Sequence, residues 1–127
     1  MLSLSLPGRV FLCMLPTDMR KSFDSLAGLV VQQLGQDPLA GDLFVFRSKR
    51  GDRLKLLYWD SDGLAIWYKR LEEGTFVFPL PSGERAKAGA HGIVIRPAEL
   101  AMLLDGMDLQ NVKRRKRYQR PQPSAVS

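Results

Sequence analysis

The chain has 127 residues, of which 45% are hydrophobic and 25% are charged, so it suits one soluble domain with a packed core and is too short for two domains of usual size. A single cysteine, Cys13, excludes an intramolecular disulfide and a thiolate cluster for zinc. The apolar N-terminal residues 1–15 are interrupted by Arg9 and are too few to span a bilayer, so we expect a cytoplasmic protein.

The first elements in the chain are predicted to be a strand and a helix. Residues 10–15 form a short apolar run that ends at Pro16, which is typical of a buried strand. Thr17 or Asp18 is expected to cap the helix that follows, and Gly35 is expected to end it. The apolar residues at helical spacing are Met19, Phe23, Leu26, Val30 and Leu34.

A β region follows this helix. Three segments are rich in aromatic and aliphatic side chains, and the turn-forming sequences 48–52 and 60–63 separate them, so two successive hairpins are predicted. The predicted strands are residues 43–47, 53–59 and 64–70. A short fourth strand is expected at residues 76–78.

The two faces of this region depend on its register. If Arg47 opposes Arg53 and Trp59 opposes Leu64, one face is apolar and forms the core. Its members are Phe44, Phe46, Leu54, Leu56, Tyr58, Ala65 and Trp67. The other face becomes a basic and aromatic surface, which suits nucleic-acid backbone contacts but is also typical of an ordinary solvated sheet. Its members are Arg47, Arg53, Lys55, Tyr68 and Arg70, with Val45, Leu57, Trp59 and Ile66 between them.

The last elements are a loop at residues 81–92, a strand at residues 93–95 and a helix that begins at Pro97 and ends at Gly106. We therefore predict an α+β fold, with a mostly antiparallel sheet of about five strands and two helices packed on one face. Residues 1–110 are expected to form one globular domain, and residues 111–127 a basic, disordered tail.

The tail carries the net charge of the chain. Removing its six basic residues from the total of 19 leaves 13, which equals the number of acidic residues, so the body is formally neutral and the tail supplies the net +6. These six residues are Lys113, Arg114, Arg115, Lys116, Arg117 and Arg120. Such a run favours a polyanion such as DNA, and the alternative is a tail that only keeps the protein in solution.

The sequence offers no recognisable catalytic set. His91 is the only histidine and is expected to be a solvated loop residue, and Cys13 is expected to be a buried, inert thiol. Asp60 and Asp62 are interpreted as turn formers, with a metal-dependent nuclease as the less favoured alternative. We therefore expect no enzyme activity, no metal, no cofactor and no small-molecule substrate.

Several segments together resemble one known family. They include residues 17–24, residues 41–46, the sequence Leu54-Lys55-Leu56-Leu57-Tyr58-Trp59-Asp60, the sequence Trp67-Tyr68-Lys69-Arg70-Leu71-Glu72, and the sequence Leu104-Asp105-Gly106-Met107-Asp108. The chain resembles, over residues 8–118, the small accessory proteins of bacterial insertion sequences of type sixty-six, often called TnpB and unrelated to the RNA-guided nuclease of that name. The resemblance implies a role in DNA transposition beside a separate, larger transposase, and it carries over no catalytic residues.

Two functional hypotheses follow from the sequence. The first is a non-catalytic accessory factor that binds DNA through the basic residues of the sheet face and of the tail. The second is a protein adaptor that docks on the transposase of the element through exposed Trp59, Ile66 and Tyr68, without touching DNA. No membrane association is expected in either case.

Overall fold

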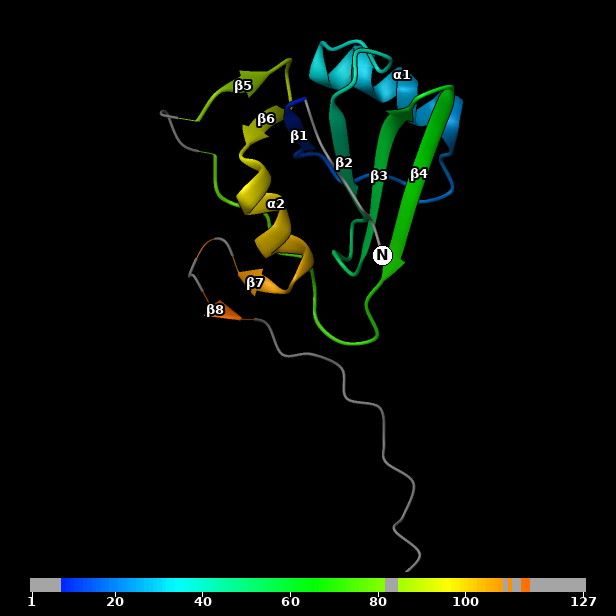
Figure 1. The fold of residues 1–127 in the computed structure, drawn as a ribbon. Coiled ribbons are helices and arrows are strands. Elements are labelled where there is room, and N and C mark those ends of the chain that lie inside the picture. Colours follow the sequence, from blue (N-terminus) through cyan, green and yellow to red (C-terminus); the bar gives the residue numbers. More distant parts are fainter. Residues whose placement is uncertain (1–7, 82–84, 109, 111–112, 115–127) are drawn as a thin grey trace, which may run out of the picture.

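The computed structural model describes residues 8–81, 85–108, 110 and 113–114. Its centre is a six-stranded sheet with the strand order β4-β3-β2-β1-β6-β5 (Figure 1). The strands are β1 (Val10–Cys13), β2 (Leu43–Arg47), β3 (Arg53–Asp60), β4 (Gly63–Arg70), β5 (Lys87–Ala88) and β6 (Gly92–Ile95). The helices are α1 (Phe23–Leu34) and α2 (Pro97–Leu104), and a two-stranded ribbon of β7 (Met107–Asp108) and β8 (Lys113–Arg114) follows α2.

The predicted α+β class and the mostly antiparallel sheet are confirmed. β1 pairs in parallel with β2, because α1 carries the chain across the sheet between them, and every other neighbouring pair in the sheet is antiparallel. The additional strand, β5, lies within the segment that was expected to be only a loop. The expected strand at residues 76–78 does not form, although Phe76 and Phe78 are buried in the core.

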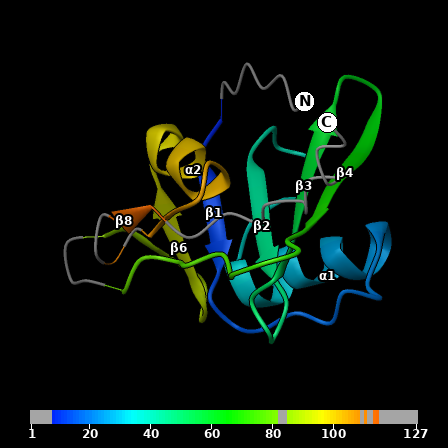
Figure 2. The ribbon, with the colours of Figure 1, turned by 90° about the horizontal axis from the view of Figure 1, so that it is seen from below.

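The expectation that both helices pack on one face of the sheet is wrong, because the two helices cover opposite faces (Figure 2). Leu12 of β1 belongs to the same buried cluster as Leu100 of α2, whereas the next residue, Cys13, belongs to the cluster that contains Val30 of α1. Successive residues of a strand point to opposite faces, so each helix covers its own side. The unbroken apolar runs of β1 and β2 are typical of strands that are buried on both faces.

The register of the first hairpin differs from the prediction by one residue, whereas that of the second is confirmed. Arg47 lies opposite Leu54 rather than Arg53, and Trp59 lies opposite Leu64 as expected. The loop sets the first register, since the Ser48 N–H donates a hydrogen bond of 3.0 Å to the Arg53 carbonyl oxygen. Because successive side chains of a strand alternate between the two faces, this shift of one residue places each β2 side chain on the face opposite to the predicted one, relative to the side chains of β3 and β4.

The start of α1 also differs from the prediction, and its end agrees with it. Ser22 is the N-cap, and its backbone N–H donates to Oγ of Ser25 at 2.9 Å. Asp18 instead accepts a hydrogen bond from the Arg20 N–H within the preceding turn. Gly35 ends the helix in the left-handed conformation, with a φ of 61°. Within the part of the chain that the structure describes, neither helix has the length and apolar character needed to cross a bilayer.

Candidate nucleic-acid interface

Several basic residues of the domain lie around the loop that joins β2 to β3. Lys49 and Arg50 form the tip of this loop, and shallow grooves lie on both sides of it. The segment from Thr17 to Arg20 and the start of β3 line one groove, and residues Thr75 to Val77 and Arg47 line the other. We call this region the basic end and define it by Arg20, Lys49, Arg50, Arg53 and Arg70.

Lys55 lies below this surface rather than on it. The residue is only 8% exposed, and its ammonium donates hydrogen bonds to the carbonyl oxygens of Met19 at 2.7 Å and Lys21 at 2.6 Å. Its Nζ also lies 4.7 Å from the centre of the Tyr68 ring. Lys55 therefore fastens the segment before α1 to the sheet, and the expectation that it belongs to an exposed basic face is wrong.

Arg47 lies on the opposite face of the sheet from Arg53, as a consequence of the corrected register. It is half-buried, its Nη1 donates to the Phe76 carbonyl oxygen at 2.9 Å, and its guanidinium lies 4.0 Å from the centre of the Phe78 ring. Burial lowers the pKa of the Arg47 guanidinium. The structure therefore does not bring Arg47, Arg53, Lys55 and Arg70 together as one exposed surface.

Arg53 and Arg70 do lie together, directly opposite each other on β3 and β4. Nη1 of Arg53 lies 3.4 Å from the hydroxyl oxygen of Tyr68, which is 48% exposed. An arginine beside an exposed aromatic ring can contact a phosphate and stack on a base. This pair and its tyrosine are the part of the predicted basic and aromatic face that the structure retains at the surface.

The cations of the basic end differ in how far they are neutralised. Arg20 pairs with Asp18 at 2.6 Å, and this contact holds the pKa of the Asp18 carboxyl at about 2. Arg70 pairs with Glu72 at 3.2 Å. Among the residues that the structure describes, no carboxylate lies within ion-pair distance of Lys49, Arg50 or Arg53. These three cations are therefore free to attract an anionic partner.

The basic run begins close to the same end of the molecule. Lys113 and Arg114 form β8, which pairs with β7 directly after α2. In Figure 1 the β7–β8 ribbon and the C-terminal end of β4 both lie at the lower end of the molecule. The remaining basic residues of the run, Arg115, Lys116, Arg117 and Arg120, lie outside the described residues. Of residues 111–127, which were expected to be disordered, the structure describes only Lys113 and Arg114, and these form β8.

The residues predicted to bind a protein partner share one face of the β3–β4 hairpin. Trp59 is 37% exposed and Tyr68 is more exposed, whereas Ile66 is partly buried against the cluster below α1. All three lie next to the edge of the sheet that β4 forms. Only Trp59 and Tyr68 therefore offer a substantial exposed surface.

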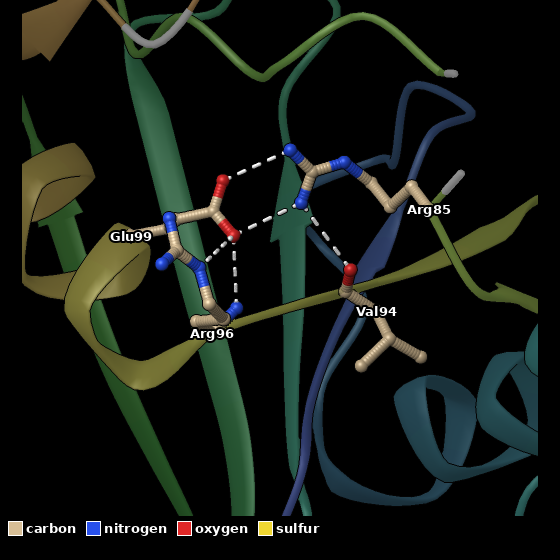
Figure 3. A network of polar contacts seen from close by, with 4 residues as sticks. All are labelled: Arg85, Val94, Arg96 and Glu99. Atoms are coloured by element: carbon tan, nitrogen blue, oxygen red, sulfur yellow. Dashed lines mark hydrogen bonds and ion pairs between the residues drawn. The ribbon is translucent and has the colours of Figure 1, made fainter. Parts of the chain in front are cut away.

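One buried polar network went unrecognised in the sequence (Figure 3). Arg85 donates to both oxygens of Glu99, at 3.0 and 2.9 Å, and also to the Val94 carbonyl oxygen at 3.4 Å. The Arg96 N–H donates to Glu99 at 3.0 Å, which is the arrangement of an acidic residue three positions after a helix cap. These bonds hold the pKa of the Glu99 carboxyl at about 2, with Arg85 as the main cause. The network fixes the start of α2 to β6.

Other candidate chemical groups are dispersed. Cys13 is buried, and burial raises the pKa of its thiol. His91 is exposed, and its backbone N–H donates to the Gln33 carbonyl oxygen. Asp60 and Asp62 are exposed at the β3–β4 turn. Within the described ranges, no group of three or more histidine, cysteine, aspartate or glutamate side chains is placed to hold a metal ion.

Comparison with known proteins decides the family. The sequence profile described as "IS66 Orf2 like protein" matches residues 8–114, which include every helix and strand of the structure. The chain belongs to the IS66 Orf2-like family. This confirms the resemblance to the accessory proteins of these insertion sequences, and it gives the chain an accessory role related to transposition.

Two curated relatives of this IS66 Orf2-like protein come from Sinorhizobium fredii (strain NBRC 101917 / NGR234). The uncharacterized protein y4jC is 41% identical over 107 residues, which cover 84% of this chain and 86% of the relative. The uncharacterized protein y4hO is 44% identical over 100 residues, which cover 79% of this chain and 81% of the relative. No solved structure matches the chain.

Proposed function

We propose that this IS66 Orf2-like protein is a non-catalytic accessory factor that binds DNA in the cytoplasm during transposition. The observation that carries the proposal is the charge distribution, in which a run of six cations without an acid supplies the whole net charge. The run begins at β8, at the same end of the molecule as Lys49, Arg50 and Arg53. We infer that the run and these three cations contact the same polyanion.

The expected binding mode is contact with the phosphate backbone. When unpaired arginine and lysine side chains neutralise phosphates, the counterions condensed on the DNA are released. The resulting affinity depends little on the DNA sequence. Arg53 and Tyr68 add a position where an unpaired base can stack. Arg47 and Lys55 are left out of the proposed interface, because their charged groups are engaged within the fold.

The test is DNA binding by the full-length chain, measured by fluorescence polarisation with duplex DNA from an element end. Replacing the six basic residues of the run by glutamine is expected to weaken binding at least a hundredfold at low salt, because about six phosphate contacts are lost. Replacing Lys49, Arg50 and Arg53 by glutamine is expected to weaken it about tenfold or more.

Lys87→Gln on β5, at the far edge of the sheet, is the matched control and is expected to bind like the unmodified chain. Unchanged affinity in the sixfold variant would show that the run has no role in DNA binding. Unchanged affinity in both multiple variants would overturn the proposed interface.

A second candidate function is a protein adaptor that docks on the transposase of the element. It is supported by the exposure of Trp59 and Tyr68 beside the edge strand β4. Co-purification with the transposase after nuclease digestion tests it, because a contact bridged by DNA does not survive that treatment. If the protein is an adaptor, the unmodified chain still captures the transposase after nuclease digestion. The Trp59→Ser, Tyr68→Ser double variant is then expected to lose this capture.

A further inference from the structure

Within the part of the chain that the structure describes, the outer edge of β4 has backbone groups that pair with no other strand. The Leu71 N–H donates to the Asp52 carbonyl oxygen at 2.7 Å, and this bond fixes which residues of β4 turn their backbone toward β3. In an antiparallel pair these residues alternate, so Lys69, Trp67 and Ala65 bond to β3. The residues between them direct their N–H and C=O groups away from the sheet. They are Leu64, Ile66, Tyr68 and Arg70.

This edge lacks two of the features that prevent pairing with another strand, namely a proline and a bulge. β4 is eight residues long and contains no proline. Each of its residues faces one residue of β3, so no bulge interrupts it. Among the described residues, no segment pairs with its outer side. Long, regular edge strands readily add a further strand, which natural proteins otherwise prevent with bulges, prolines or charges.

The charges along β4 are arranged so that the strand complements itself. The turn before β4 carries Asp60 and Asp62, and its other end carries Lys69 and Arg70. When two copies of such a strand pair antiparallel, the acidic end of one meets the basic end of the other.

We propose that the edge of β4 is an interface between two copies of this chain, which join their sheets across a twofold axis at Ile66. In this register Asp62 lies opposite Arg70 of the second copy, and Leu64 lies opposite Tyr68. A register with its twofold axis at Trp67 would place Asp62 opposite Glu72 and is disfavoured by repulsion between the carboxylates. Within one chain Arg70 already contacts Glu72, so in the dimer it lies between two carboxylates.

The side chains fit this register on the other face of the sheet as well. Ala65 of one copy lies opposite Trp67 of the other, so a small side chain meets a large one, whereas the shifted register would place the two Trp67 rings opposite each other. Charge and side-chain size therefore favour this alignment over the one that pairs Asp62 with Glu72, and the backbone pairing pattern allows it.

The first test measures the oligomeric state of the nuclease-treated, full-length chain by sedimentation and light scattering without DNA. A dimer is expected at micromolar concentrations. Asp62→Arg and Arg70→Asp are each expected to raise the dimer dissociation constant at least tenfold, because each change turns two attractive pairs into two repulsive ones. The double variant Asp62→Arg, Arg70→Asp is expected to restore the dimer. A monomeric unmodified chain, or a double variant no better than the single ones, would overturn the proposed register.

The second test addresses the backbone. Tyr68→Pro removes an N–H that points outward and leaves the bonds between β3 and β4 in place, so it is expected to give a monomer. Tyr68→Ala keeps this N–H and serves as the matched control, which is expected to remain largely dimeric. Circular dichroism establishes that both variants are folded. A folded Tyr68→Pro variant that still dimerises would overturn the proposal, and neither test depends on DNA binding.

Discussion

Lys55 shows how the surroundings of a residue decide its role. Its sequence position, among alternating basic and aromatic side chains, favours an exposed surface. In the structure its ammonium instead donates hydrogen bonds to two backbone carbonyl oxygens of the segment that leads into α1. This segment lines the groove of the basic end, so in the proposed DNA-binding mode Lys55 acts only by keeping Arg20 and its neighbours in place.

We therefore expect Lys55→Met to lower the free energy of unfolding by about 1–3 kcal/mol, since two hydrogen bonds from a charged donor are lost. Urea denaturation measures this change. Arg53→Met is the matched control, because Arg53 lies on the same face of the same strand but remains partly exposed. It is expected to change stability by no more than about 0.5 kcal/mol and to weaken DNA binding instead. Equal stability of the two variants would contradict the structural role of Lys55.

At the scale of elements, α2 depends on one buried carboxylate for its attachment to the sheet. Glu99 is 8% exposed and receives bonds from Arg85 and from the backbone of Arg96 (Figure 3). The α2 helix has only eight residues, a length that is barely stable in isolation. Its position therefore relies on this network and on the burial of Leu100 and Leu103.

The Glu99 network predicts a pH dependence of stability. The folded pKa of Glu99 is about 2, below its ordinary value of 4.5, so the unfolded chain binds more protons in this range. The stabilisation is fully present above about pH 4.5 and is lost as the pH falls toward 2. It amounts to about 3 kcal/mol.

Urea denaturation between pH 7 and pH 2.5 measures this dependence. The Glu99→Gln variant is expected to be less stable than the unmodified chain at pH 7 and to lose less stability on acidification. Asp18→Asn is the matched control, since Asp18 also has a pKa of about 2 but is exposed. A Glu99→Gln variant with the same pH dependence as the unmodified chain would contradict the role of the network.

At the scale of the whole molecule, charge is divided between a neutral body and a basic C-terminal run. The family match ends at residue 114, so it includes Lys113 and Arg114 but not the four basic residues that follow. The basic end of the body lies entirely within the match. The run and the basic end can therefore make separate contributions to affinity.

This division predicts the salt dependence of DNA binding. About six phosphate contacts from the run correspond to a slope of about −5 in a plot of log affinity against log salt, and to a loss of roughly a thousandfold between 50 and 200 mM salt. In the sixfold glutamine variant only the basic end still contacts phosphates. The slope measured for this variant is therefore expected to be about −3 or smaller in magnitude. Polarisation titrations at four salt concentrations measure both slopes. A slope that does not change in the variant would contradict binding through the run.

The sequence by itself determined part of the local structure of this protein. The end of α1 at Gly35, the start of α2 at Pro97 and the pairing of Trp59 with Leu64 all follow from local signals, the last because a two-residue turn allows few alternatives. The motifs of β3 and β4 also indicated the family, which the profile match confirms. These features depend on neighbours in the chain, which a sequence displays directly.

Only the tertiary structure decided which faces those elements present. A longer loop between β2 and β3 allows more than one register, and a change of one residue moved Arg47 to the face away from Arg53. The positions of the two helices on opposite faces, and the bonds that bury Lys55, depend on contacts between residues far apart in the chain. Because the side-chain period of a strand is two, such contacts determine whether a given cation is exposed or part of the core.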